Sequence, residues 1–275
     1  IAAAPLAKGM QQLAQDYRKA TSRGILTQHQ SEKNLYRVYP RVGAPQLKGV
    51  DLVIEAAVEK MDLKKKIFQN LDQESSPNTL LATNTSALSI SELAQGLRYP
   101  ERIIGLHFFN PVSRMPLIEV IAGKKTSPTS IQRAVQFVTS IGKIPVVVAD
   151  RPGFIVNRIL VPYMLEAAHL LESGLQVSEI DNTMLDFGMP MGPLRLCDEV
   201  GLDIALDVAE TLAASFPDRV QIPHAIIQMV KAGHLGRKSG QGFYHYKQGK
   251  ACSKASHQKK PDYLEFKITA QDRMV

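Results

Sequence analysis

Short apolar runs alternate with amphipathic segments along the first half of the chain, a pattern typical of parallel α/β structure. The runs predict strands at residues 51–55, 79–84, 102–109, 117–121 and 144–149. Too few residues separate the third and fourth runs for a helical crossover, so we expect these two strands to pair antiparallel. Between the runs the spacing of apolar residues predicts helices, among them a basic helix over residues 9–23.

The pattern changes at Asp150-Arg-Pro-Gly153, after which only helical periods are found as far as about Gly233. We therefore expect a sheet-containing domain over residues 1–150 and a helical domain over residues 151–246. Residues 247–275 begin with many Lys, Ser and Gln residues, which favours a linker that leads to the start of a further helical repeat.

Composition narrows the class of protein. No apolar run is long enough to cross a bilayer, so we expect no membrane span. Cys197 and Cys252 lie far apart, which gives neither a disulfide framework nor metal-ligand spacing, and we expect no metal site. The net charge of +7 comes from scattered basic residues without interleaved aromatic residues, so we expect no nucleic-acid partner. A nucleotide or a CoA ester fits this charge equally well.

His107 is the first candidate for chemistry, because it stands at the end of an apolar strand just before Asn110-Pro111. In open α/β sheets ligands bind at the carboxyl ends of the strands, and an imidazole titrates near neutral pH, which suits a general base. A core histidine bonded to the backbone is the alternative, and for a lone strand histidine it is the more frequent one.

Glu119 makes the catalytic interpretation stronger. It is flanked by Ile118 and Val120 in the strand expected to pair with the His107 strand, and a buried carboxylate needs a partner. A carboxylate that holds an imidazole fixes its tautomer and makes it more basic. The alternative for Glu119 is a solvent-facing position on an edge strand.

Several segments, in this order, resemble the L-3-hydroxyacyl-CoA dehydrogenase family. They are Asn84-Thr-Ser86, His107-Phe-Phe-Asn-Pro111 with Glu119 after it, Pro152-Gly-Phe-Ile-Val-Asn-Arg158, Pro190-Met-Gly-Pro193 and Gly236-Arg-Lys-Ser-Gly-Gln-Gly-Phe-Tyr244. The likeness runs from about residue 5 to residue 246. It implies an α/β Rossmann-like domain, N-terminally truncated, with a mostly parallel sheet and an antiparallel edge, followed by an all-α C-terminal domain.

The resemblance also implies roles for individual residues. His107 is similar to the base that removes the proton of the 3-hydroxyl group, and Glu119 to its orienting partner. Ser86 and Asn157 resemble the polar groups that bond to the reacting oxygen and to the imidazole. From the residues alone, Ser86 is as readily a turn hydroxyl and Asn157 a structural clamp between domains.

NAD is the cofactor that the resemblance implies. Glu59, Lys64 and Asn84 match positions near NAD, although Lys64 to Lys66 also read as the solvated face of a helix. The chain has no G-x-G-x-x-G turn to hold the pyrophosphate, and its first residue aligns after the family's second strand. We therefore expect these residues alone to bind NAD poorly and to expose an apolar sheet edge.

The function implied is the NAD-dependent oxidation of L-3-hydroxyacyl-CoA to 3-oxoacyl-CoA in fatty-acid β-oxidation. Alternatives are a 3-hydroxybutyryl-CoA dehydrogenase of short-chain metabolism and a non-catalytic acyl-CoA-binding relative. A sugar-nucleotide or 6-phosphogluconate-type dehydrogenase is a further alternative; it would use a cysteine nucleophile, for which Cys197 is the candidate, or a lysine base.

A multifunctional parent chain is favoured by the tail, which resembles the linker to a second helical repeat. Self-association or packing on further domains of that parent is expected. The compartment expected is the cytoplasm of a bacterium, or the mitochondrion or peroxisome of a eukaryote. Arg237 and Lys238 are candidates to meet phosphate, but the glycines beside them more simply indicate tight turns. The basic residues 17–23 have only a diffuse electrostatic role.

Overall fold

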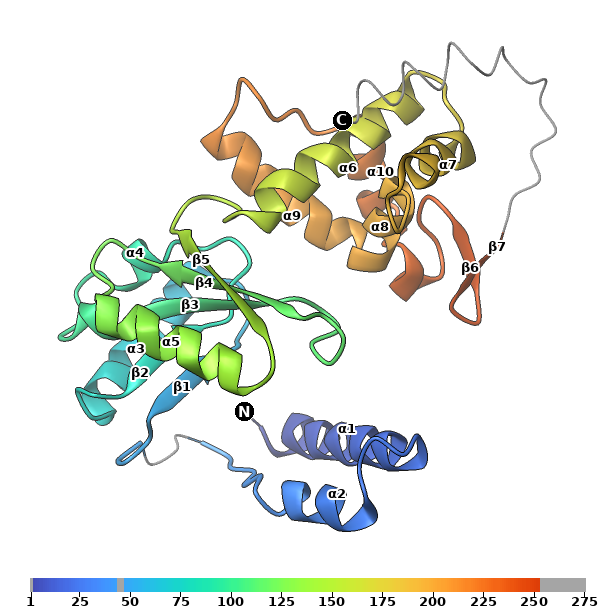
Figure 1. Ribbon diagram of the computed structural model, residues 1–275. Helices are drawn as coiled ribbons and strands as arrows, with labels where there is room; N and C mark the ends of the chain where they lie inside the picture. Colours follow the sequence, from blue (N-terminus) through green and yellow to red (C-terminus); the bar gives the residue numbers. More distant parts are fainter. Residues whose placement is uncertain (1, 44–46, 253–275) are drawn as a thin grey trace. The chain divides into compact units, whose positions relative to one another are not determined.

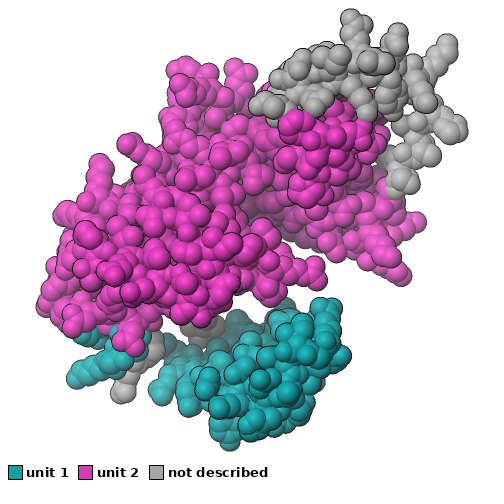
Figure 2. All heavy atoms as spheres, viewed as in Figure 1, with its two compact units in different colours: residues 1–50, 74–76 teal, residues 51–73, 77–275 magenta. Residues whose placement is uncertain are grey.

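The computed structural model describes residues 2–43 and 47–252, which fall into two compact units (Figure 2). The first unit comprises residues 1–50 and 74–76, and the second comprises residues 51–73 and 77–275. The candidate site residues of the sequence all belong to the second unit.

The first unit consists mainly of two helices, α1 (Ala3–Ser22) and α2 (Gln28–Leu35). Helix α1 covers all but the last residue of the basic helix predicted over residues 9–23, and it begins earlier. Helix α2 starts with a capping box, in which the Thr27 hydroxyl accepts from the Gln30 amide and the Gln30 side chain accepts from the Thr27 amide. The Thr21 and Ser31 hydroxyl oxygens, 2.6 Å apart, link the two helices.

The second unit contains a five-stranded sheet in the order β1-β2-β3-β4-β5 (Figure 1). The strands are β1 (Leu52–Glu55), β2 (Leu80–Thr83), β3 (Ile103–Phe108), β4 (Leu117–Ala122) and β5 (Ile144–Ala149). β1, β2 and β3 pair parallel, β3 and β4 pair antiparallel, and β4 and β5 pair parallel. The antiparallel pair predicted from the short connection is confirmed, and the reversal lies one strand in from the edge.

Helices cover both faces of this sheet because its strands are apolar on both sides. On one face α5 (Pro128–Ser140) packs Ala134 and Val138 against strand residues that include Ile104 and Val120. On the other face α3 (Met61–Glu74) and α4 (Ile90–Leu93) pack Phe68 and Ile90 in a second core cluster. A short 3₁₀ helix, η1 (Pro100–Arg102), leads into β3.

Two features of the strands bear on the site. Gly105 in β3 lies opposite Ile121 of β4, and a Cβ at this position would come within 2.9 Å of the Ile121 side chain, so only glycine allows this close pairing. β1 is the first strand in the order of the described sheet, and its Ile54 is 39% exposed.

The remainder of the second unit is helical. It comprises α6 (Val156–Glu172), α7 (Val177–Phe187), α8 (Pro193–Val200), α9 (Leu202–Ser215) and α10 (His224–Lys231), which share one apolar core. The 3₁₀ helix η2 (Arg237–Ser239) and a hairpin of β6 (His245–Lys247) and β7 (Lys250–Cys252) follow. The hairpin extends into the segment predicted as a linker from residue 247; residues 253–275 lie outside the described part of the chain.

Two buried carboxylates fasten the last segment to these helices. Asp198 of α8 accepts from the amides of Phe243 and Tyr244, both at 2.9 Å, and from the Tyr246 hydroxyl at 2.7 Å. Asp181 of α7 accepts from the Tyr244 hydroxyl at 2.7 Å and from two amides at the start of α8. Burial raises the pKa of both carboxyls, more than these hydrogen bonds lower it.

Among the helices of residues 2–43 and 47–252, none combines the length and the hydropathy that crossing a bilayer requires.

Candidate functional site

His107 and Glu119 meet across the antiparallel pair of strands. They are direct register partners in β3 and β4, so their side chains lie on the same face of the sheet. His107 Nδ1 and Glu119 Oε2 are 2.7 Å apart, and both side chains are buried. The structure therefore contains the contact that the sequence predicted from the apolar flanks of Glu119.

The second oxygen of Glu119 holds the start of α6. Oε1 accepts from the amides of Ile155 at 2.9 Å and Val156 at 3.0 Å. Burial acts to raise the pKa of this carboxyl, but the hydrogen bonds from His107, Val156 and Ile155 outweigh burial and leave the pKa below its usual value of 4.5. Glu119 is thus ionised at neutral pH and joins β3, β4 and α6.

The imidazole of His107 is held in one orientation. A neutral imidazole that donates from Nδ1 to a carboxylate keeps its lone pair on Nε2, and that nitrogen is free to act as the base. The rings of Phe109 and Phe154 lie beside it, with centroids 4.4 and 5.9 Å away. Phe154 is buried and has a φ of +49°, so the turn before α6 places its ring against His107 in a strained backbone conformation.

Ser86 and Asn157 are brought together by a hydrogen bond that the sequence did not predict. The Asn157 amide Nδ2 donates to the backbone oxygen of Ser86 at 3.0 Å. This bond joins the start of α6 to the turn that follows β2. A bond of this kind is what the structural alternative for Asn157 requires, and the Ser86 hydroxyl takes no part in it.

The Ser86 turn is fixed from its other side by Glu59. The Glu59 carboxylate accepts from the Ser86 amide at 2.7 Å, from the Ala87 amide at 3.3 Å and from the Thr85 hydroxyl. Asn84 Oδ1 accepts from the Phe108 amide at 3.1 Å, next to His107. Glu59, Asn84 and Ser86 thus gather where β1, β2 and β3 end.

The sequence allowed Lys64 to lie on the solvated face of a helix, but the structure buries its side chain. Its side chain is 0% exposed, and Nζ lies 2.8 Å from Glu55 Oε2, 2.9 Å from Glu55 Oε1 and 3.5 Å from Glu59 Oε2. Thr83 also donates to Glu55 Oε2, at 2.6 Å. The ammonium group therefore lies behind Glu59, buried among protein groups.

Glu55 and Phe154 were missed from the sequence as members of this constellation. Glu55 carries a signal that could have found it, because it ends an apolar strand and, like Glu119, would be costly to bury without a cation. Phe154 gives no such signal, since a phenylalanine beside a glycine is common in any core.

The nicotinamide end of NAD fits the group formed by Glu59, Asn84 and Ser86. The Glu59 side chain is 39% exposed and offers carboxylate oxygen to an amide donor, and Asn84 and Ser86 add polar atoms at the adjacent strand end. This is also the edge at which open α/β sheets bind ligands.

The other candidates from the sequence are engaged elsewhere. Cys197 is fully buried and burial raises the pKa of its thiol, so it is a poor nucleophile. Arg237 pairs with Glu199 at 2.8 Å, and Lys238 pairs with Asp203 at 2.5 Å. Within the described ranges, no cluster of three His, Cys, Asp or Glu side chains is arranged to hold a metal.

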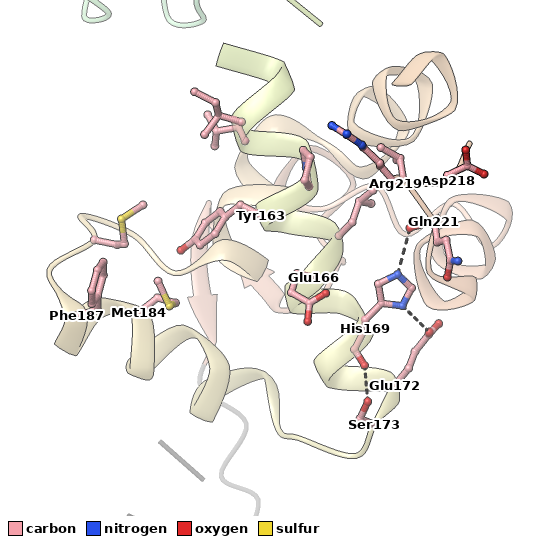
Figure 3. Close-up of a pocket in the computed structure, with 16 residues that line it drawn as sticks. Tyr163, Glu166, His169, Glu172, Ser173, Met184, Phe187, Asp218, Arg219 and Gln221 are labelled. Carbon is pink, nitrogen blue, oxygen red and sulfur yellow. Dashed lines mark hydrogen bonds and ion pairs between the residues drawn. The ribbon is translucent and has the colours of Figure 1, made fainter. Parts of the chain in front are cut away.

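A separate cavity of about 1010 Å³ lies among α6, α7 and residues 218–221 (Figure 3). Its one histidine, His169, has Nε2 3.1 Å from the Gln221 backbone oxygen and Nδ1 3.6 Å from Glu172. Both ring nitrogens thus face acceptors, and none of the candidate catalytic residues lines this cavity. The cavity is therefore distinct from the His107 site.

Two family models match the chain. Residues 1–151 match the NAD binding domain of 3-hydroxyacyl-CoA dehydrogenase, and residues 153–246 match the C-terminal domain of 3-hydroxyacyl-CoA dehydrogenase. Together they account for most of the chain.

Curated relatives and solved structures agree with these matches. The fatty acid oxidation complex subunit alpha of Acinetobacter baumannii is 41% identical over 252 residues, which are 91% of this chain and 35% of that protein. The chain thus spans about a third of the length of the curated relatives it matches.

Among solved structures, (S)-3-hydroxybutyryl-CoA dehydrogenase PaaH1 from Ralstonia eutropha is 39% identical with a TM-score of 0.86, over 90% of this chain and 89% of that chain. The 3-hydroxybutyryl-CoA dehydrogenase of Escherichia coli is 36% identical with a TM-score of 0.87, over 95% and 56% of the two chains. With the contact between His107 and Glu119 in place and both family domains matched in order, the chain belongs to the 3-hydroxyacyl-CoA dehydrogenase family.

Proposed function

We propose that the protein oxidises L-3-hydroxyacyl-CoA to 3-oxoacyl-CoA with NAD, as the dehydrogenase step of fatty-acid β-oxidation. The observation that carries this proposal is the buried pair of His107 and Glu119, with 2.7 Å between Nδ1 and Oε2. A base whose orientation and tautomer are fixed by a carboxylate is what removal of a hydroxyl proton requires.

In this proposal Nε2 of His107 takes the proton of the 3-hydroxyl group. Ionised Glu119 stabilises the imidazolium that results and holds the ring in place through Nδ1. NAD, when bound, supplies the acceptor for the hydride from C3. Ser86, in the turn after β2, and Asn157, at the start of α6, are joined by a hydrogen bond, and they are the polar groups that we propose to bond to the reacting oxygen and to the imidazole, where donors stabilise developing negative charge.

Glu59, Asn84 and Ser86 are the residues that we propose to hold the nicotinamide end of the cofactor. Lys64 acts on that end through Glu59, because its own ammonium is buried. The domain limits that we propose are residues 1–150 for the NAD-binding domain and 151–246 for the helical domain.

The parent is proposed to be a multifunctional chain, because the curated relatives are fatty acid oxidation complex alpha subunits and the chain covers 35% of the first of them. Packing on further domains of that parent is the proposed assembly, and 3-hydroxyacyl-CoA is the proposed substrate. A bacterial parent would act in the cytoplasm, and a eukaryotic one in the mitochondrion or peroxisome.

Assay of the full-length parent with acetoacetyl-CoA and NADH tests the proposed function. We expect loss of NADH absorbance that depends on both reactants, and we expect it to survive alkylation of accessible cysteines because Cys197 is buried. A parent that leaves acetoacetyl-CoA unreduced while it binds both ligands would support the non-catalytic alternative. Loss of turnover on alkylation would favour the cysteine-dependent dehydrogenase classes.

A short-chain function is the second candidate, because two of the similar structures are 3-hydroxybutyryl-CoA dehydrogenases. The same assay with 3-oxoacyl-CoA substrates of increasing chain length separates the two. A kcat/KM that falls steeply beyond four carbons would favour short-chain metabolism, and a kcat/KM that holds or rises would favour fatty-acid β-oxidation.

A further inference from the structure

Glu55, Lys64 and Glu59 form a charged network at the carboxyl end of β1. Both oxygens of Glu55 lie within 2.9 Å of Lys64 Nζ, and Glu59 Oε2 lies 3.5 Å from the same nitrogen. Glu55 and Lys64 are buried, whereas the Glu59 side chain is 39% exposed. Two carboxylates share one ammonium group, so the network carries a formal charge of −1.

Burial makes this charge effective. Glu55 is further held by the Thr83 hydroxyl at 2.6 Å and by the Ala57 amide, and its carboxylate is almost wholly buried. Charges in such surroundings are screened far less than charges at the surface. Lys64 pairs mainly with Glu55, so it neutralises the charge of Glu59 only in part. Glu59 therefore carries uncompensated negative charge at the ends of the strands.

Glu59 also fixes the place where that charge acts. It accepts from the Ser86 and Ala87 amides, so the carboxylate and the Ser86 turn form one rigid group. This is the group to which the proposed function assigns the nicotinamide end of the cofactor. The nicotinamide ring is cationic in NAD⁺ and neutral in NADH, so a negative charge beside it acts on the two forms differently.

We propose that Glu55, although buried behind the site, makes this network anionic and thereby favours the binding of NAD⁺ relative to NADH. The inference rests on the proposed function, because that function places the nicotinamide ring beside Glu59. Without Glu55, Lys64 and Glu59 would form a neutral pair. Glu55 is in this sense a positioning residue that acts through Lys64 and Glu59, without touching the cofactor.

Dissociation constants of NAD⁺ and NADH test the proposal in the full-length parent, at low ionic strength. NADH binding is followed by its fluorescence, and NAD⁺ binding by competition. Glu55→Gln brings the network from −1 to neutral, and we expect the ratio of the NAD⁺ constant to the NADH constant to rise about tenfold. Lys64→Gln removes the positive charge, and because buried Glu55 then takes up a proton more readily, the ratio should fall, but by less than tenfold.

The double variant Glu55→Gln/Lys64→Gln restores the charge of −1 and should return the ratio close to that of the unaltered protein. Glu92→Gln is the matched control, because it removes a carboxylate from an exposed pair with Lys65 and should leave the ratio unchanged. Should one single variant fail to fold, the other still reports the direction of the effect.

A purely structural role for Glu55 predicts a different result, in which both dissociation constants rise together and their ratio stays constant in both single variants. That result would overturn the inference. Failure of the proposed function would give a different result. An unaltered parent that binds neither NAD⁺ nor NADH would show that the proposed nicotinamide site does not exist.

Discussion

Glu119 holds two structural elements with one carboxylate. One oxygen orients His107, and the other accepts from the Ile155 and Val156 amides at the start of α6. Its pKa lies below the usual 4.5, because these hydrogen bonds outweigh the effect of burial. The ionised side chain therefore stabilises the folded state above pH 4.5, and this contribution is lost as the pH falls through the folded-state pKa.

Glu119→Gln should lower the free energy of unfolding at pH 7 by about 2 kcal/mol, because an amide keeps one acceptor oxygen where the carboxylate had two charged ones. The difference from the unaltered protein should shrink as the pH falls from 4.5 through the lowered folded-state pKa of Glu119, because the stabilising charge is lost over that range. Urea unfolding followed by circular dichroism over this pH range measures it.

Glu92→Gln is the matched control, because Glu92 pairs with Lys65 at 2.7 Å with both side chains partly exposed and should contribute little. If the loss of unfolding free energy in Glu119→Gln instead stays constant or grows toward low pH, the hydrogen bonds to Glu119 do not lower the pKa of its carboxyl.

At the scale of single residues, the sequence predicted those contacts that follow from the apolar pattern of the strands and from the need of a buried charge for a partner. His107 and Glu119 could be paired because both stand in apolar strands that a short connection joins. The burial of Lys64 could not be predicted, since its partner Glu55 lies in another element and the run of three lysines is typical of a solvated helix face. The contact of Asn157 with the Ser86 backbone oxygen was also out of reach, because it joins residues far apart in the chain.

Asp198 acts at the scale of elements, because it joins α8 to the segment that leads into β6. It is buried and accepts from the Phe243 and Tyr244 amides and from the Tyr246 hydroxyl. The sequence predicted the strands and the major helices from their apolar periods. It did not predict this junction, because two of the three donors, the amides of Phe243 and Tyr244, belong to an irregular segment without a period.

Asp198→Asn should loosen that segment, because an amide has a single acceptor oxygen for three donors and leaves buried N–H groups unsatisfied. We expect hydrogen exchange of residues 240–247 to become about 30-fold faster, which corresponds to about 2 kcal/mol of lost local stability. Hydrogen exchange followed by mass spectrometry measures this directly.

Asp203→Asn provides the comparison, because Asp203 is a partly exposed partner of Lys238 and should change exchange in this segment only slightly. Equal exchange in the Asp198 variant and the unaltered protein would mean that the apolar contacts alone hold the segment.

On the scale of the whole molecule, the described chain combines a sheet domain, a helical domain and a separate pair of helices. The order of the sheet and helical parts followed from the change of pattern near residue 150, and the family matches divide the chain at a similar place. The separation of α1 and α2 as a compact unit could not be predicted, because a unit boundary depends on contacts that a local pattern does not contain. Weak binding of NAD by this chain alone stays a prediction of the sequence.

The most direct test of the account is the rate of acetoacetyl-CoA reduction by the full-length parent that carries His107→Gln. Glutamine can neither take up nor release the proton at this position, so we expect kcat to fall by at least about 100-fold while the dissociation constant of NADH stays within about twofold. A His107→Gln parent that turns over at the rate of the unaltered protein would contradict the assignment of His107 as the base.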